Sequence, residues 1–148
     1  MINRDSGEVV DSPIVNATVD SGKTISVLRF GSPGNLVVER DNGVHTLRDG
    51  NYQLNILAWR VATVGGGPNM AENYSFGDEE VDGFFRFFGD GDGDRDTDVA
   101  DLGQFGAAFR SRSGDDHFNS DFDVDGDDDV DVADLGQFGQ RFRERMDF

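Results

Sequence analysis

Apolar and β-branched residues gather in short runs over the first 63 positions of the chain, and turn-forming residues separate these runs. The pattern predicts strands at residues 14–19, 24–30 and 36–40. Asp41-Asn42-Gly43 is a strong hairpin signal, so a fourth strand is expected at residues 44–47. Residues 52–63 alternate apolar side chains between two faces, which predicts a long central strand with Trp59 in the core.

The pattern changes after residues 65–69, because three glycines and a proline sustain neither a strand nor a helix. We expect a small β domain at residues 1–70, a linker at 71–78 and a helical domain at 79–148. Residues 79–88 carry apolar side chains at helical spacing, with acids in the first turn, which predicts a short helix. The predicted fold class is α+β: a small β-sheet or sandwich-like domain followed by an all-α domain.

The second half of the chain contains an internal repeat. When the sequence is shifted by 33 residues, residues 90–109 align with residues 123–142 at 15 of 20 positions. Each copy is an aspartate-rich loop followed by an amphipathic segment, and we expect two helices whose apolar stripes pack on each other. The stripes consist of Leu102, Phe105 and Phe109 in the first copy and Leu135, Phe138 and Phe142 in the second.

Both loops have Asp at positions 1, 3, 5, 7, 9 and 12. This is the EF-hand spacing, in which alternate residues turn inward around one ion and position 12 binds it with both carboxylate oxygens. Without an ion the carboxylates would repel one another. Because flexible loops with six or more oxygen ligands favour calcium over magnesium or manganese, the spacing predicts two calcium ions. Position 6, normally a glycine with positive φ, is Arg95 in the first loop and Asp128 in the second, and Arg95 should weaken the first site.

Charge and composition narrow the range of functions. Of the formal charge of −17, residues 77–148 account for −15, from 22 acids and 7 bases. Such a field repels nucleic acid and anionic lipid and attracts cations. The apolar runs are far shorter than the roughly 20 residues of a membrane-spanning helix, so no membrane insertion is expected. The sequence has no Cys, its only histidines are the isolated His45 and His117, and it has no nucleophile motif, so we expect that the protein is not an enzyme.

The segments GDGDGDRDTDVADLGQF and FDVDGDDDVDVADLGQF resemble the two calcium-binding segments of dockerin domains, which are tandem EF-hand-type loop-helix halves. The resemblance covers residues 88–143. It implies ligands at Asp90, Asp92, Asp94, Asp96 and Asp101, and at Asp123, Asp125, Asp127, Asp129 and Asp134. Asp98 and Asp131 fall at position 9, where contact with the ion is often through water, and are assigned to a second shell. A shorter stretch, residues 47–56, resembles a late strand of an immunoglobulin-like sandwich.

The resemblance also implies a partner. In dockerins, loop positions 10 and 11 help to contact a cohesin, and here they are the apolar pairs Val99-Ala100 and Val132-Ala133. Identical pairs would allow a partner to bind in either of two orientations. The expected function is calcium-dependent docking to a cohesin-like protein, by a monomeric module of a larger secreted or surface protein. The alternative is a terminal domain that calcium merely stabilises, without any partner.

Two further features lead to expectations about packing. Position 8 carries the residue through which paired EF-hand loops form a small strand contact, and Val130 suits this role better than Thr97. The helices also carry unusual glycines, each of which costs about 1 kcal/mol relative to Ala. These are Gly103, Gly106, Gly136 and Gly139. Either the Phe stripes pack closely over them, or a partner approaches there.

Overall fold

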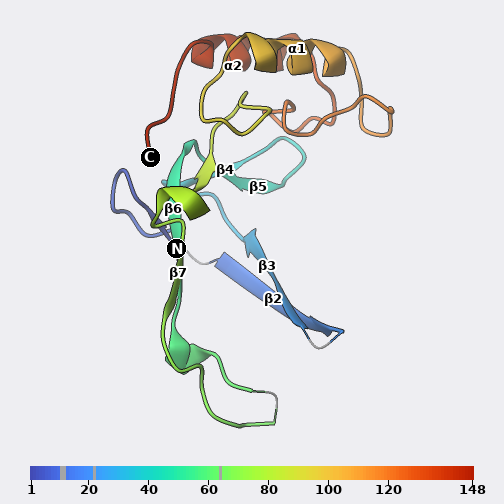
Figure 1. Cartoon of the computed structure of the whole chain (residues 1–148). Coiled ribbons are helices and arrows are strands. Elements are labelled where there is room, and N and C mark those ends of the chain that lie inside the picture. The colour runs from blue at the N-terminus through green and yellow to red at the C-terminus, as the bar shows by residue number, and fades with distance from the viewer. Residues whose placement is uncertain (11–12, 22, 64) are drawn as a thin grey trace.

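The fold consists of small antiparallel sheets followed by two helices, so the predicted α+β class is confirmed (Figure 1). The computed structural model of the chain describes residues 1–10, 13–21, 23–63 and 65–148. A four-stranded sheet contains β1 (Ile2–Asn3), β6 (Gly50–Ile56), β7 (Tyr74–Phe76) and β8 (Phe84–Arg86). Two separate hairpins pair β2 (Pro13–Asp20) with β3 (Lys23–Phe30), and β4 (Val37–Glu39) with β5 (His45–Leu47). The helices are α1 (Val99–Ala108) and α2 (Val132–Arg141).

The four strands predicted from the apolar runs and the hairpin turn are confirmed as β2 to β5. The long strand predicted at residues 52–63 is correct only as far as Ile56, because the 3-10 turn η1 (Ala58–Arg60) follows. The prediction that Trp59 lies in the core is wrong. Its side chain is 61% exposed, and the Arg60 guanidinium lies 4.2 Å from the centre of its ring.

The short helix predicted at residues 79–88 is also wrong. The chain there forms a single 3-10 turn, η2 (Glu80–Asp82), and then β8, which pairs antiparallel with β6. Phe84 and Phe85 belong instead to a strand, because pairing with β6 satisfies the backbone polar groups of residues 84–86. The segment expected as a linker, residues 71–78, contains β7, so residues 74–76 pair with β6 before residues 84–86 do.

Two clusters of buried side chains hold the molecule together. The core of the β region (residues 1–86) contains Val10, Leu36, Val37, Leu47 and Tyr52. Tyr52 is fully buried, and its hydroxyl donates a hydrogen bond of 2.8 Å to the Arg48 carbonyl. The core of the repeat region (residues 87–148) contains Phe88, Phe105, Ala108, Phe122, Val130 and Phe138. Aromatic burial therefore dominates the repeat region, where the chain is also most acidic.

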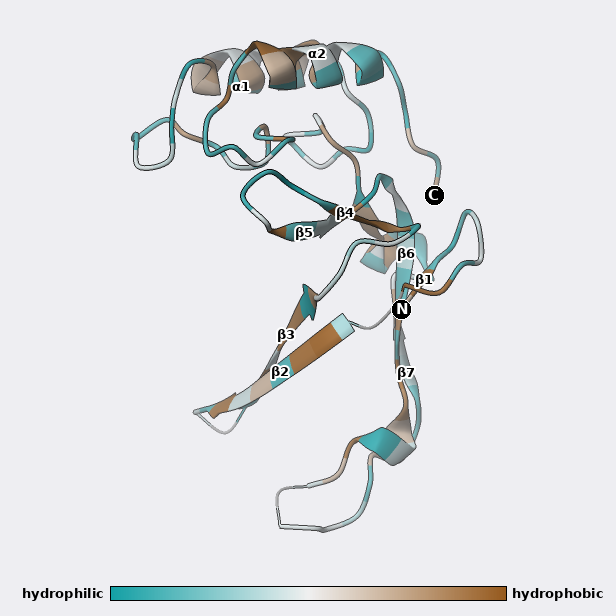
Figure 2. Ribbon diagram, turned by 180° about the vertical axis from the view of Figure 1, so that it is seen from behind, coloured by the Kyte–Doolittle hydropathy of each residue, from teal (hydrophilic) through white to brown (hydrophobic). Residues whose placement is uncertain are grey.

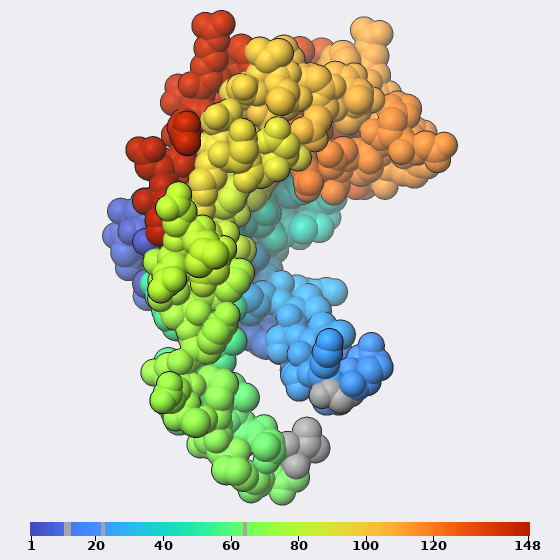
Figure 3. Space-filling view, viewed as in Figure 1, coloured from blue at the N-terminus to red at the C-terminus, as the bar shows by residue number. Residues whose placement is uncertain are grey.

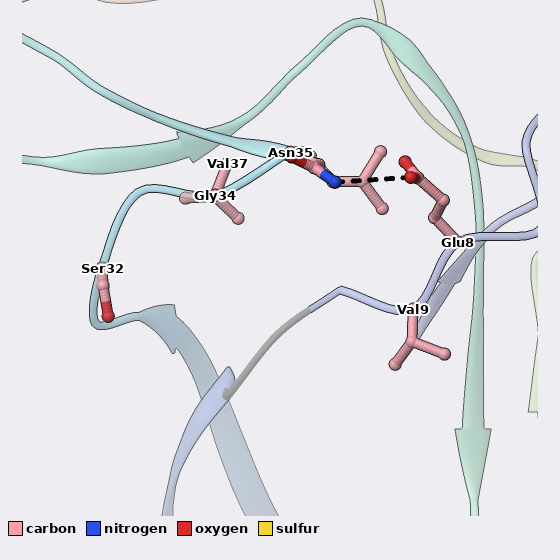
Figure 4. Close-up of a pocket in the computed structure, with 7 residues that line it drawn as sticks. Glu8, Val9, Ser32, Gly34, Asn35 and Val37 are labelled. Atoms are coloured by element: carbon pink, nitrogen blue, oxygen red, sulfur yellow. Dashed lines mark hydrogen bonds between the residues drawn. The ribbon is translucent and has the colours of Figure 1, made fainter.

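The β2–β3 hairpin and the far ends of β6 and β7 extend away from the helices (Figures 1 and 3). Much of the hairpin is hydrophobic (Figure 2). Five of its apolar side chains are 45–65% exposed. These are Ile14, Val15, Val19, Ile25 and Val27. At the base of the hairpin, a cavity of about 190 Å³ lies between Val9 and residues 32–37. The Asn35 side-chain amide donates a hydrogen bond of 3.4 Å to the Glu8 carboxylate beside this cavity (Figure 4). Within the described residues, no helix has the length and apolar character needed to cross a membrane.

Candidate metal centre

The final aspartate of each loop holds the loop closed. Asp101 lies at position 12 of loop one (residues 90–101), and its two carboxylate oxygens accept hydrogen bonds of 2.7 Å from the N–H groups of Gly91 and Asp98. Asp134 of loop two (residues 123–134) accepts in the same way, at 2.7 and 2.8 Å, from Val124 and Asp131. Both carboxylates are at most 1% exposed. One side chain thus joins the beginning of each loop to the start of the helix that follows.

The aspartate at position 9 begins each helix. Asp98 caps α1 by accepting a hydrogen bond of 2.6 Å from the Ala100 N–H, and Asp131 caps α2 through Ala133 at the same distance. An aspartate at the N-terminus also has a favourable interaction with the helix dipole. Sequence reasoning placed these two residues in a second shell, and their structural role is that of helix caps.

The structure gathers most of the predicted ligands into groups whose carboxylate oxygens lie within 4.8 Å of one another. In loop one the groups are Asp90, Asp92 and Asp94, and Asp96, Asp98 and Asp101. In loop two they are Asp123, Asp125 and Asp134, and Asp129, Asp131 and Asp134. Asp127 is the one predicted ligand outside these described groups, while the position-9 residues Asp98 and Asp131 join them. Each loop can therefore offer several oxygens to one cation.

The residue at position 6 adopts the left-handed conformation that an EF-hand loop requires. The φ angle is 74° at Arg95 and 69° at Asp128. A side chain in this region costs about 1 kcal/mol, and Asp tolerates it better than Arg. The turn expected from the spacing is thus present in both loops, although neither has glycine at this position.

Desolvation raises the pKa of six loop carboxyls above their ordinary value of 3.8, and repulsion from neighbouring carboxylates raises it further. At Asp90 and Asp134, hydrogen bonds from backbone N–H groups oppose this rise in pKa. The six are Asp90, Asp92, Asp96, Asp125, Asp129 and Asp134. Ionisation of these carboxyls therefore costs free energy in the folded loops, and a bound cation would remove this cost.

The aspartates at position 7 of the two loops indicate whether the loops suit a cation. In both Asp96 and Asp129, the Oδ1 atom is buried and has no hydrogen-bond partner among the described residues. A buried carboxylate oxygen without a donor is unfavourable, and a hard divalent cation would compensate it. The same atom is left without a partner in both copies of the repeat, so the donor set fits a cation in each loop.

Each repeat unit forms backbone hydrogen bonds with the other at position 8 of its loop. Thr97 of loop one exchanges backbone hydrogen bonds of 2.6 and 3.0 Å with Arg143 and Glu144, which follow α2. Val130 of loop two exchanges bonds of 2.7 and 3.0 Å with Arg110 and Ser111, which follow α1. The prediction that the two loops contact each other through position 8 is therefore wrong in its partner, because each loop pairs with the segment after the opposite helix. Thr97 and Val130 are both fully buried, but the Thr97 hydroxyl has no hydrogen-bond partner among the described residues, so Val130 suits this position better, as expected.

The apolar stripes pack on each other through their phenylalanines, as predicted. The rings of Phe105 and Phe138 lie 5.1 Å apart, and Phe122 packs edge-on against Phe105 at 5.5 Å. The leucines of the stripes are not part of this contact, because Leu102 and Leu135 are both 41% exposed. They lie on the outer side of the helix pair instead.

This outer side of the helices is apolar and poorly covered. Val99 is 72% exposed and Val132 is 70% exposed. A Cβ atom placed on any of the four helical glycines would meet no heavy atom of the described residues within 4 Å. Packing of the Phe stripes over these glycines is therefore ruled out, and they leave a smooth surface beside the two valines.

Side-chain contacts of Asp49, Arg95 and Arg40 attach the repeat region to the β region, and sequence reasoning missed them. The Asp49 carboxylate accepts from the Phe88 N–H at 2.9 Å and from the Arg141 guanidinium at 2.5 Å. The Arg95 guanidinium donates to the Asn51 side chain at 2.6 Å. Arg40 reaches Asp123 at 3.3 Å. These pairs are far apart in the sequence, and no local pattern signals them.

No family model matches the chain, and no curated protein or solved structure matches it either.

Proposed function

We propose that the chain is a dockerin-like module that binds two calcium ions and docks onto a cohesin-like protein. The observation that carries the proposal is the pair of equivalent loops, each closed by a buried position-12 aspartate and each with an unpartnered position-7 oxygen. Bound calcium would supply positive charge to the crowded carboxylates of each loop. Asp101 and Asp134 would hold the ion from the helix side, and the earlier aspartates would surround it from the loop side.

Calcium suits these loops better than magnesium. The donors are oxygens spread over 12 residues, and a flexible set of this kind accommodates six to eight ligands. Magnesium requires nearly ideal octahedral geometry and keeps much of its water. Weak binding, at about 0.1 to 1 mM, would suit an extracellular module, and we propose a secreted or cell-surface location on this basis.

The outer surface of α1 and α2 supports the docking role. Val99 and Val132 are more than two-thirds exposed, occupy equivalent positions in the two units and lie beside the uncovered glycines. Close approach of a partner backbone would account for glycines that otherwise destabilise both helices. A binding role also agrees with the loop chemistry, in which the aspartates would bind metal, and we propose no catalytic activity.

Isothermal titration calorimetry with calcium chloride tests the metal sites. We expect two sites per chain, with magnesium binding at least tenfold more weakly, and a rise in melting temperature because the ion binds the folded state. Asp134→Asn should remove one site. Binding of fewer than two ions by the wild-type protein, or equal affinity for magnesium, would contradict the calcium proposal.

Surface plasmon resonance against a panel of purified cohesin domains tests the docking role. The double variant Val99→Asp with Val132→Asp should abolish binding, because it places a charge in both copies of the contact surface. Either single variant should retain binding if the partner can turn around and use the other copy. Val81→Asp is the matched control, since Val81 is 89% exposed but lies in η2.

The rival role is purely structural, with calcium stabilising the repeat region and no partner. It predicts that calcium raises the melting temperature, that no cohesin binds, and that the double valine variant behaves like the wild type. The same two measurements therefore separate the two functions.

A further inference from the structure

The turn between β4 and β5 lies directly against loop two (Figures 1 and 3). The Asp41 N–H donates to the Asp125 carbonyl at 2.5 Å, and the Asn42 N–H donates to the Gly126 carbonyl at 2.9 Å. A Cβ atom on Gly126 would lie 2.5 Å from the Cβ of Arg40, so the turn can approach this closely only because residue 126 is a glycine. At the equivalent glycine of loop one, Gly93, a Cβ would meet nothing within 4 Å among the described residues.

Because of this contact, the first aspartates of the two loops have different partners. Asp90 accepts hydrogen bonds from three backbone N–H groups of its own loop, those of Gly93, Asp94 and Arg95, at 2.7 to 3.1 Å. Asp123 accepts one such bond, from Gly126 at 2.6 Å. Its second partner is the Arg40 guanidinium, whose Nη2 lies 3.3 Å from its Oδ1.

Arg40 is held in this position mainly by charge. Its side chain is 14% exposed and that of Asp123 is 3% exposed, so solvent screens the ion pair little. The Nε and Nη2 atoms of Arg40 are buried and form no hydrogen bond with the described residues. A buried guanidinium with unused donors is unfavourable unless negative charge surrounds it, and loop two provides seven aspartates.

We propose that Arg40 is a tethered cation that partly stands in for calcium at loop two and thereby lowers the calcium affinity of that site. The inference rests on the proposed calcium binding and deepens it. Arg40 stabilises the calcium-free loop more than the loaded loop, because the negative charge it neutralises is larger when no ion is present. By thermodynamic linkage, the ion and the guanidinium must weaken each other's interaction with the loop by the same factor.

The experiment is a calcium titration followed by ¹⁵N–¹H NMR on the whole chain. The amides of Gly93 and Gly126 occupy position 4 of the two loops and donate to the first aspartate of each, so they report the two sites separately. Arg40→Gln removes the charge and keeps a polar side chain. It should tighten calcium binding at Gly126 by roughly tenfold, leave the curve at Gly93 unchanged, and lower the melting temperature of the calcium-free protein.

Two control variants test whether the effect depends on the charge of residue 40 and on its buried position. Arg40→Lys keeps the charge and should keep the wild-type affinity at Gly126. Arg112→Gln removes a charge that also pairs with loop two, at 3.5 Å from Asp129, but Arg112 is 80% exposed. Its effect should therefore stay below about twofold, because water and salt screen exposed pairs.

An unchanged or weaker affinity at Gly126 in Arg40→Gln would overturn the inference while leaving calcium binding intact. A wild-type protein in which neither glycine shifts with calcium would instead overturn the proposed function, and this inference with it.

Discussion

Apolar side chains are buried very differently in the β region and the repeat region. In the repeat region, Phe88, Phe105, Phe122 and Phe138 are at most 2% exposed, although aspartates surround them. In the β region, apolar residues of the β2–β3 hairpin are about half exposed, although the local charge is close to neutral. Burial thus follows the reciprocal packing of the two units rather than the local balance of apolar and charged residues.

The largest effect should come from the aromatic core. Phe138→Ala should lower the free energy of unfolding of the repeat region by about 3–5 kcal/mol, because it removes a buried ring and leaves a cavity. Trp59→Ala removes a larger ring from an exposed position and should change stability by no more than about 0.5 kcal/mol. Urea denaturation followed by circular dichroism measures both. Equal losses would show that the two regions do not differ in this way.

The pH dependence of stability should come next in size and should originate in the repeat region. The folded-state pKa values of six loop carboxyls are raised above 3.8, so the calcium-free folded protein binds protons more tightly than the unfolded chain. This contribution to stability is fully present below pH 3.8 and is lost as the pH rises through the raised values. The urea midpoint without calcium should therefore be higher at pH 5 than at pH 7.

With saturating calcium the order of the two midpoints should reverse, because the ion binds the deprotonated carboxylates. A calcium-free midpoint that increases from pH 5 to pH 7 would contradict the assigned direction of the pKa shifts.

A smaller effect is expected at the helix caps. Asp131→Ala should destabilise the calcium-free protein by about 1 kcal/mol, because the Ala133 N–H loses its acceptor. Asp131→Asn keeps an acceptor oxygen while removing the same charge, so it separates the hydrogen bond of the cap from the effect of the charge. It should leave the stability of the calcium-free protein almost unchanged. Thermal denaturation of the three proteins in a chelating buffer measures the difference.

The smallest effect is expected on the hairpin. Val15→Thr and Val19→Thr exchange half-exposed apolar groups for polar ones of similar shape, and each should change the free energy of unfolding by less than about 0.5 kcal/mol. A loss above about 1 kcal/mol, measured by urea denaturation, would indicate that this surface is covered in solution.

The sequence predicted the elements that local chemistry determines. The spacing of Asp90 to Asp101 and its repetition predicted the loops, their left-handed position 6 and the helices that follow, because these features depend on neighbours within 12 residues. The strands from residue 13 to residue 47 were predictable for the same reason. Four short runs bounded by turn residues leave few alternatives.

Features that depend on distant partners were not predictable. Residues 84–86 have a spacing compatible with a helix, but pairing with β6 makes them a strand. Trp59 lies in a segment that leaves the sheet after Ile56, so its hydrophobicity does not bring it into the core. Arg40 is 83 positions away from Asp123, and nothing in the sequence around either residue indicates their contact.

The exchange of backbone hydrogen bonds between the two units has a consequence for how such a protein could arise and be divided. Neither unit satisfies the backbone groups of position 8 by itself, since the segment that pairs with Thr97 comes from the second unit and the segment that pairs with Val130 comes from the first. Two peptides cut apart at Gly114 should therefore be incomplete alone and recover the fold when mixed. For the same reason, an ancestor with a single unit would have had to associate with its own twin, and duplication would have placed both partners on one polypeptide.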